Sequence, residues 1–193
     1  MSKILAAWES EPGAVDESTY TSWAHPGFHA FNGWAAEREF CELAGALARM
    51  VHGPIIETGT GGGFTTRRIA KAIETTNSLL ICYESDQHIR EALSTLDFFD
   101  GSGPAVLADD PTPTGIQFAE ASLTVLDSDI PFREREIDLW AESARYGSLL
   151  LVHDTGNSHP VGSVWMELRH RIQDLEIKGA FLNNPRGAFL GVR

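Results

Sequence analysis

The sequence predicts an α/β sandwich around a mainly parallel sheet, and three observations carry that prediction. Short apolar runs alternate with segments of helical periodicity along most of the 193-residue chain, as expected when helices cover both faces of a sheet. A glycine-rich turn at 57–63 joins one apolar run to a helical segment. The tetrapeptide Gly-Ala-Phe-Leu occurs twice, at 179–182 and 187–190, with a turn sequence between the copies. This repeat predicts a hairpin that closes the chain.

Each expected element follows from a local pattern. Apolar residues recur at helical spacing over 33–50, which predicts the first helix. The run Leu-Leu-Ile-Cys-Tyr at 79–83 is apolar throughout, as expected for a strand that is buried on both faces. Further strands are expected at 55–57, 105–107, 123–126 and 149–152, and further helices at 65–74, 86–98, 118–121, 132–145 and 161–175.

Length and composition indicate one folded domain with an N-terminal extension. Residues 1–33 are expected to form a lid or extension, and residues 34–193 a single domain. The extension contains Trp8, Trp23 and Phe28, which are candidates for packing against a second copy of the chain. No run of about 18 apolar residues occurs, so a membrane span is not expected. The first residues turn acidic too soon for a signal peptide.

Charge and cysteine content narrow the classes of partner. The net charge is −12, and residues 84–142 carry fourteen acidic side chains against three basic ones. Such an acidic surface repels phosphate backbones, so a nucleic-acid partner is not expected. It suits a cationic cofactor or a divalent metal ion. Cys41 and Cys82 lack the spacing of metal ligands and are expected to be buried thiols in a reducing cytoplasm.

The spacing of the glycines distinguishes between nucleotide-binding motifs. Gly59 and Gly61 begin a G-x-G pattern, but Phe64 stands where a dinucleotide-binding fingerprint requires its third glycine. No G-K-[ST] follows, so a P-loop is not expected. The pattern present is an acidic residue, Glu57, and then G-x-G-x-G ending at Gly63. Backbone N–H groups in such a turn can approach a ligand closely, and the next helix adds the positive end of its dipole.

This pattern resembles motif I of the class I S-adenosylmethionine (SAM)-dependent methyltransferases. The resemblance covers roughly residues 34–193. It implies a Rossmann-like sandwich with a mainly parallel seven-stranded sheet and a C-terminal antiparallel hairpin. It also implies SAM as the cofactor, with Glu57 near the methionine end and with Gly59, Gly61 and Gly63 against it.

Carboxylates after the second and third strands are candidates for binding the adenosine part of the cofactor, since ligands of open α/β sheets lie at the carboxyl ends of strands. Glu84 is expected to accept the ribose hydroxyls, whereas Asp86 is better placed to cap the next helix. After the third strand the resemblance implies an acidic contact to the adenine amino group. Asp109 matches that position best, with Asp110 in reserve. A surface turn fits the composition there equally well.

The clusters after the fourth and fifth strands carry the candidate chemistry. Asp-x-Asp at 127–129 and His-Asp-Thr at 153–155 resemble the small-molecule O-methyltransferase group that includes the cephalosporin-hydroxylase-like and macrolide-sugar enzymes. The resemblance implies Asp127, His153 and Asp154 as ligands of Mg²⁺ or Mn²⁺, with Asp127 also beside the cofactor. Because imidazole suits Mg²⁺ poorly, the alternative is that His153 is the general base of catalysis, together with Asp127.

Structural roles remain open for some of these residues. Asp127 could cap the helix that is expected from 132, and Asp154 could cap a following turn. Arg133 and Arg135 lie among glutamates, a pattern typical of an exposed, ion-paired helix face.

The sequence therefore predicts a cytoplasmic SAM-dependent methyltransferase that methylates a hydroxyl group of a small molecule, with or without a divalent metal. The family branches that methylate amino groups of bases carry an Asn/Asp-Pro-Pro-aromatic motif after the fourth strand, and 127–132 differs from it. One alternative is a catalytically inactive protein of this fold that binds the cofactor or a partner. Another is a nicotinamide-dependent oxidoreductase, which Gly63 and Phe64 disfavour.

Overall fold

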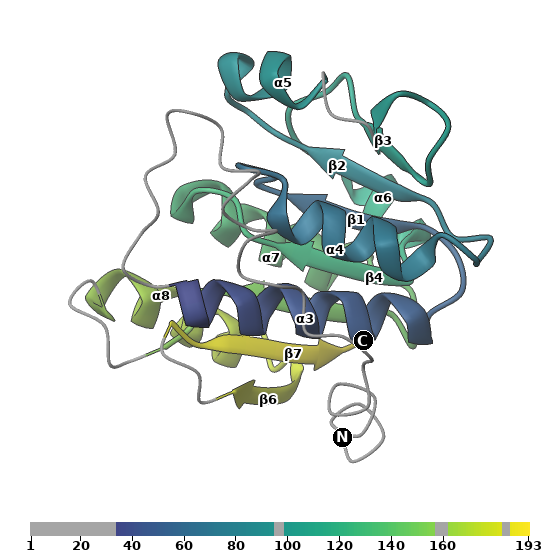
Figure 1. The fold of residues 1–193 in the computed structure, drawn as a ribbon. Helices are drawn as coiled ribbons and strands as arrows, with labels where there is room; N and C mark the ends of the chain where they lie inside the picture. The colour runs from purple at the N-terminus through teal and green to yellow at the C-terminus, as the bar shows by residue number, and fades with distance from the viewer. Residues whose placement is uncertain (1–33, 95–98, 157–161, 183–185) are drawn as a thin grey trace.

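The computed structural model describes residues 34–94, 99–156, 162–182 and 186–193 (Figure 1). The helices are α3 (Trp34–Met50), α4 (Phe64–Ile73), α5 (Gln87–Leu93), α6 (Gly115–Glu120), α7 (Ile130–Ser143) and α8 (Gly162–Asp174). The strands are β1 (Ile55–Thr58), β2 (Leu80–Tyr83), β3 (Ala105–Leu107), β4 (Leu123–Leu126), β5 (Leu149–His153), β6 (Lys178–Leu182) and β7 (Ala188–Val192). The lid predicted at 1–33, with its aromatic residues, lies outside the described residues, so its roles stay predictions.

The strands form one seven-stranded sheet in the order β3-β2-β1-β4-β5-β7-β6. The first five strands pair in parallel, and β7 runs antiparallel to both β5 and β6. This confirms the predicted α/β sandwich with a C-terminal antiparallel hairpin. The chain order reverses at β1, which lies between β2 and β4. Such a switch point opens a crevice beyond the carboxyl ends of the strands, where ligands of open α/β sheets bind.

Helices cover both faces of the sheet, with α3 and α4 on one face and α6, α7 and α8 on the other (Figure 1). The first core packs side chains such as Phe40, Leu47 and Ile69 against the sheet. The second is built around Trp140 and Leu168. Because both faces are covered, the central strands are almost entirely buried, as their apolar sequences predict.

Side chains alternate along β1, so its last two residues, Glu57 and Thr58, point to opposite faces of the sheet. Ile55 packs in the core beneath α3 and α4, and Ile56 packs in the core beneath α7 and α8. With the period of two that a strand imposes, Glu57 reaches Thr66 on α4. Thr58 reaches α7 on the opposite face.

The N-termini of α5 and α7 show which of the candidate residues act as helix caps. Asp86 is confirmed as a cap, because its Oδ1 accepts hydrogen bonds from the backbone N–H groups of His88 (2.8 Å) and Ile89 (3.1 Å). Helix α7 starts at Ile130, before the predicted position, with Asp129 as its N-cap residue. Asp127 is therefore not the cap of α7.

Both cysteines are buried free thiols, as predicted. Burial raises the pKa of Cys41 to about 12, so this thiol stays neutral and unreactive at physiological pH. Within the described part of the chain, no helix combines the length and the apolar character that crossing a membrane requires.

Candidate functional site

A cavity of about 210 Å³ opens at the carboxyl ends of the central strands. Its wall comes from the end of β1, from the segments that follow β2, β3 and β4, and from α5 and α7. Among the described residues, the ionisable side chains in this wall are all carboxylates: Glu84, Asp127, Asp129 and Glu136. A cavity with this lining attracts a ligand that carries positive charge.

The glycine turn forms one side of this cavity through Gly59 and Gly61. Gly59 has a φ of 71°, and a Cβ atom there would overlap the backbone of Asp127. Glycine is thus required for the segment after β4 to pack directly on the turn. Gly61 has a φ of 52°, and a Cβ atom there would make only an ordinary contact of 3.8 Å, with the carbonyl oxygen of Gly59. Gly63 does not line the cavity; it is the left-handed N-cap of α4.

Glu84 lies where the sequence placed it, at the end of β2 and in the cavity wall. One carboxylate oxygen accepts a hydrogen bond from the N–H of Gly61 (2.9 Å), and the other accepts one from the N–H of Asp86 (2.9 Å). These bonds fix the carboxylate against the glycine turn. Each oxygen keeps a lone pair for a further donor, so Glu84 can still accept two hydroxyl groups.

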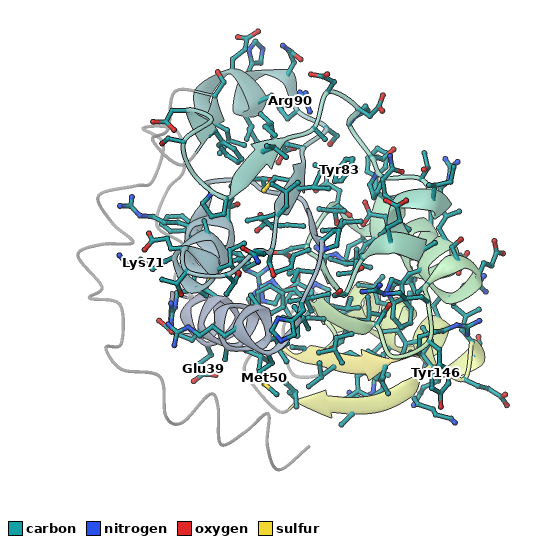
Figure 2. The ribbon with its side chains drawn as sticks, turned by 90° about the vertical axis from the view of Figure 1, so that its right-hand side faces the viewer. Glu39, Met50, Lys71, Tyr83, Arg90 and Tyr146 are labelled. Carbon is teal, nitrogen blue, oxygen red and sulfur yellow. The ribbon has the colours of Figure 1, made fainter. Side chains whose placement is uncertain are left out.

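The structure does not bring Asp109 into the cavity wall. Its side chain is exposed, and the segment after β3 lines the cavity through Pro111 and Thr112 instead. Arg90 on α5 holds this segment in place, because its guanidinium donates to the carbonyl oxygens of Ala108 (2.6 Å) and Asp109 (3.1 Å). Figure 2 shows Arg90 on α5, at the β3 side of the sheet. Asp110 is likewise exposed and outside the wall.

Glu57 is buried on the other face of β1 and does not line the cavity. Its Oε2 accepts hydrogen bonds from the hydroxyl of Thr66 (2.6 Å) and the thiol of Cys82 (3.4 Å). Burial raises the pKa of Glu57 to about 8, against the lowering effect of these hydrogen bonds. Among the described residues, the carboxyl group of Glu57 therefore links β1 to α4 and β2 through hydrogen bonds.

The raised pKa of Glu57 predicts a specific dependence of stability on pH. The pKa of this carboxyl is about 8 in the folded protein, against an ordinary value of 4.5, so its neutral form stabilises the fold fully below the lower value. This contribution is lost as pH rises toward 8. Glu57→Gln mimics the neutral carboxyl and does not ionise. The difference in free energy of unfolding between this variant and the wild type should therefore shift in favour of the variant by about 1.4 kcal/mol for each pH unit in that window.

Urea unfolding at pH 5 and pH 8.5 measures this gain, with Glu120→Gln as the control because Glu120 is exposed at the end of α6. An equal difference between wild type and Glu57→Gln at both pH values would contradict the prediction.

Asp127, His153 and Asp154 are brought together at the ends of the neighbouring strands β4 and β5, with candidate ligand atoms within 4.8 Å of one another. The Nδ1 atom of His153 lies 2.9 Å from Oδ1 of Asp127 and 3.9 Å from Oδ1 of Asp154. Asp127 is the member of this cluster that lines the cavity.

His153 is fully buried. Its ring stacks on Phe40 of α3, with 4.1 Å between ring centroids, and its Nε2 finds no hydrogen-bond partner among the described residues. Burial by itself would lower the pKa of His153, but Asp127 and Asp154 act against it and the net pKa is raised. The imidazole is therefore held as a hydrogen-bond donor toward Asp127.

Two arginines balance the charges of the cluster. Arg133 on α7 donates to Oδ1 of Asp127 (3.0 Å), Oδ2 of Asp154 (3.2 Å) and the carbonyl oxygen of His153 (2.9 Å). Arg186, just before β7, donates to Oδ1 (2.7 Å) and Oδ2 (3.0 Å) of Asp154. Burial raises the pKa of Asp154, while His153 and Arg133 lower it in part.

The donor set does not fit a resident divalent metal ion. Both oxygens of Asp154 and one oxygen of Asp127 already accept hydrogen bonds from guanidinium groups. A metal ion among these oxygens would have to displace Arg133 or lie against its positive charge, which is unfavourable at low exposure. The sequence thus identified the cluster of three side chains, but the positive charge beside it comes from arginines.

The prediction that Arg133 lies on an exposed helix face is wrong. Arg133 and Glu136 are each 3% exposed, whereas Arg135 is exposed. Arg133 and Glu136 share the inward face of α7 with Ile137 and Trp140. These positions follow the i, i+3, i+4, i+7 spacing of a buried helical stripe, and this spacing is the signal that would have found both residues.

The fold is similar to that of solved methyltransferases. The SAH-bound methyltransferase PaMTH1 from Podospora anserina has a TM-score of 0.68 at 12% identity, covering 100% of this chain and 94% of that one. Cofactor-bound Rv0187 from MTB has a TM-score of 0.63 at 16% identity, covering 99% and 88%. A SAM-dependent O-methyltransferase from Thermotoga maritima has a TM-score of 0.61 at 13% identity, covering 94% and 71%.

At these identities the likeness is one of fold. No family model matches the chain, and no curated protein matches its sequence. The chain therefore has the Rossmann-like methyltransferase fold, with a cavity at the carboxyl ends of its central strands.

Proposed function

We propose that this protein is a SAM-dependent methyltransferase that acts on a hydroxyl group of a small molecule. The observation that carries the proposal is the cavity in which the glycine turn meets Glu84, at the carboxyl ends of β1, β2 and β4. The similarity in fold to a SAH-bound and a cofactor-bound structure supports it.

The cavity wall suits SAM in its hydrogen-bonding groups and its charge. Glu84 is held by the N–H groups of Gly61 and Asp86 and retains acceptor capacity for the two ribose hydroxyls. Gly61 leaves room for a ligand to approach the backbone of the turn. The carboxylates around the wall favour a ligand with a positively charged sulfur. When bound, SAM would supply an electrophilic methyl group.

In this proposal the protein's own contribution is to position the substrate and to accept its hydroxyl proton. Asp127 lies in the cavity wall, and His153 and Arg133 fix the orientation of its carboxylate. Asp127 is thus better placed than His153 to meet the substrate, because the imidazole is fully buried against Phe40. His153 orients Asp127 and can share its proton. Alignment of the reacting atoms supplies a large part of the rate enhancement in such transfers.

One observation favours the alternative of a SAM-fold protein without catalytic activity. His153 is the candidate general base, yet it is fully buried and is not among the described residues that line the cavity. Transfer of a labelled methyl group from SAM to any member of a panel of small hydroxylated compounds would favour the enzyme. Cofactor binding without transfer would favour the inactive protein.

Calorimetric titration with S-adenosylhomocysteine tests the cofactor assignment. We expect the wild type to bind at micromolar concentration and Glu84→Ala to bind roughly 30-fold more weakly or worse, because two charge-assisted hydrogen bonds to the ribose are lost. Glu91→Ala is the matched control, since Glu91 is an exposed carboxylate on α5 outside the cavity wall and should leave the affinity unchanged.

The titration is run in EDTA and repeated with Mg²⁺ or Mn²⁺. Equal affinity in both is expected from the arginine-bound carboxylates. A wild type that binds S-adenosylhomocysteine under neither condition would overturn the proposed function.

A further inference from the structure

Among the described residues, the carboxyl end of β5 carries an excess of positive charge, in contrast to the acidic cavity wall beside it. The guanidinium groups of Arg133, Arg169 and Arg186 all donate to oxygens at this end of the strand. The described carboxylates that pair with them are those of Asp127 and Asp154. Three guanidinium groups against two carboxylates leave a net positive charge, which attracts a ligand with a negative group.

Arg169 on α8 supplies the excess charge, because it has no carboxylate partner among the described residues. Its guanidinium carbon lies 3.9 Å from the centroid of the Phe181 ring. Its Nη1 donates a long hydrogen bond to the carbonyl oxygen of Thr155 (3.4 Å). Stacking on a ring uses the flat face of a guanidinium group and leaves the N–H groups in its plane for other acceptors. This half-buried cation therefore keeps donors for a ligand.

Arg186 lies beside the same helix. Its guanidinium carbon is 5.6 Å from the centroid of the Trp165 ring, and Trp165 precedes Arg169 by one helical turn on α8. Arg186 donates to both oxygens of Asp154, yet its side chain remains 26% exposed. Both guanidinium groups thus adjoin the first two turns of α8 and reach the surface.

The segment after β5 is a fixed platform for these two arginines. The backbone N–H groups of Thr155 and Gly156 donate to the carbonyl oxygens of Gly187 (3.3 Å) and Arg186 (2.9 Å). The hydroxyl group of Thr155 is buried and has no hydrogen-bond partner in the described part of the chain. Because a buried hydroxyl group without a partner is costly, a ligand that brings an oxygen acceptor to this segment is favoured.

The proposed function directs a substrate toward this platform. In that function the substrate's hydroxyl group meets Asp127 after β4, while Glu84 after β2 holds the ribose of the cofactor. The rest of the substrate then extends away from the cofactor over β5 and β7, which follow β4 in the sheet. Neighbouring strands lie about 4.8 Å apart, so the start of β7 is about 10 Å from the end of β4. A small molecule can span this distance.

We propose that Arg169 and Arg186 bind a carboxylate group of the substrate, so that this protein methylates hydroxylated carboxylic acids. The inference rests on the proposed function and adds the chemical class of the substrate to it. The planar guanidinium group of Arg169 can donate to both oxygens of a carboxylate. The small excess of positive charge suits the single charge of a carboxylate better than the double charge of a phosphate.

The test measures binding of three phenolic acids and their amides to the wild-type protein saturated with S-adenosylhomocysteine. The acids are para-hydroxybenzoate, para-hydroxyphenylacetate and para-hydroxyphenylpropionate, which place the carboxylate at increasing distances from the hydroxyl group. Each amide has nearly the same shape without the charge. By calorimetric titration we expect at least one acid to bind about tenfold or more tightly than its amide, because a charge-assisted hydrogen bond is lost in the amide.

Arg169→Gln should reduce this preference to within about threefold, because the cation without a carboxylate partner is removed. Arg171→Gln is the matched control, since Arg171 is an exposed arginine two positions away that pairs with Asp138; it should keep the wild-type preference. Thermal melts and the affinity for S-adenosylhomocysteine establish that each variant is folded. A second measurement needs the wild type alone, because added KCl should weaken binding of the acid and leave that of the amide unchanged.

Each other outcome overturns the inference. If no acid binds the wild type more tightly than its amide, the substrate class is wrong and the proposed function remains. If Arg169→Gln keeps the preference, or Arg171→Gln loses it equally, the site is wrongly assigned. A wild type that does not bind S-adenosylhomocysteine overturns the proposed function, and this inference fails with it.

Discussion

Replacing Arg133 with methionine is expected to lower the free energy of unfolding by about 3 kcal/mol or more, because it leaves buried charge unpaired. Arg133 is 3% exposed and its guanidinium contacts two carboxylates, those of Asp127 and Asp154. It also donates to the carbonyl oxygens of His153 and Ser128. Methionine fills a similar volume without replacing any of these donors. Urea unfolding at pH 7 measures the loss.

Arg135→Met is the control for this variant, because Arg135 is exposed on the same helix; its stability should stay within about 0.5 kcal/mol of the wild type. A loss below about 1 kcal/mol in Arg133→Met would mean that the ion network is not a stabilising element of the fold.

The same variant tests whether arginine stands in the place of a metal ion. Added Mn²⁺ should leave the melting temperature of the wild type unchanged, because Arg133 and Arg186 occupy the oxygens of the cluster. It should raise that of Arg133→Met, whose Asp127 and Asp154 have lost a shared cation. A wild type that Mn²⁺ stabilises would instead restore the metal site that the resemblance implied.

Replacing Gly59 with alanine is expected to cost about 3 kcal/mol and to abolish binding of S-adenosylhomocysteine. The residue has a φ of 71°, and a side chain in that region costs about 1–2 kcal/mol. The added Cβ atom would also overlap the backbone of Asp127 and Ser128, and overpacking adds about 1–3 kcal/mol. Because Asp127 lines the cavity, relief of this overlap must move the wall.

Gly101→Ala separates the two contributions. Gly101 has a φ of 85° and no atom within 4 Å of a built Cβ, so alanine there brings the backbone cost without the overlap. Both variants are compared with the wild type by thermal melts and by calorimetric titration. If Gly59→Ala proved no less stable than Gly101→Ala and still bound the ligand, the close contact between the turn and the segment after β4 would not be needed.

The order of strands and helices along the chain could be predicted from the sequence. The strand β2 at 80–83 is apolar without interruption, and the glycine turn lies between a strand and a helix. Both patterns are formed by residues that are neighbours in the sequence, so they can be recognised without knowledge of the tertiary contacts. The same holds for Asp86, whose role as a cap depends on the backbone two and three residues further on.

The sequence predicted which candidate site residues lie at the carboxyl ends of the strands. Glu84, Asp127 and Asp154 directly follow the parallel strands β2, β4 and β5, and His153 is the last residue of β5, so topology places all four at the same edge of the sheet. Asp109 shows the limit of that argument, because the segment after β3 continues past it and meets the cavity two residues later. The position of a residue after a strand fixes its edge of the sheet but not the direction of its side chain.

The sequence by itself thus determined the fold, the glycine turn and the cluster of candidate residues at the carboxyl ends of the strands. The tertiary structure alone decided which charges are buried and which groups balance them. Arg133 and Asp154 lie 21 positions apart in the chain, and Glu136 meets Thr58 across 78. The partners of a charged side chain come from segments that only the packing of α7 on the sheet brings together. Whether a charge is exposed or paired in the interior is therefore a property of that packing rather than of the local pattern.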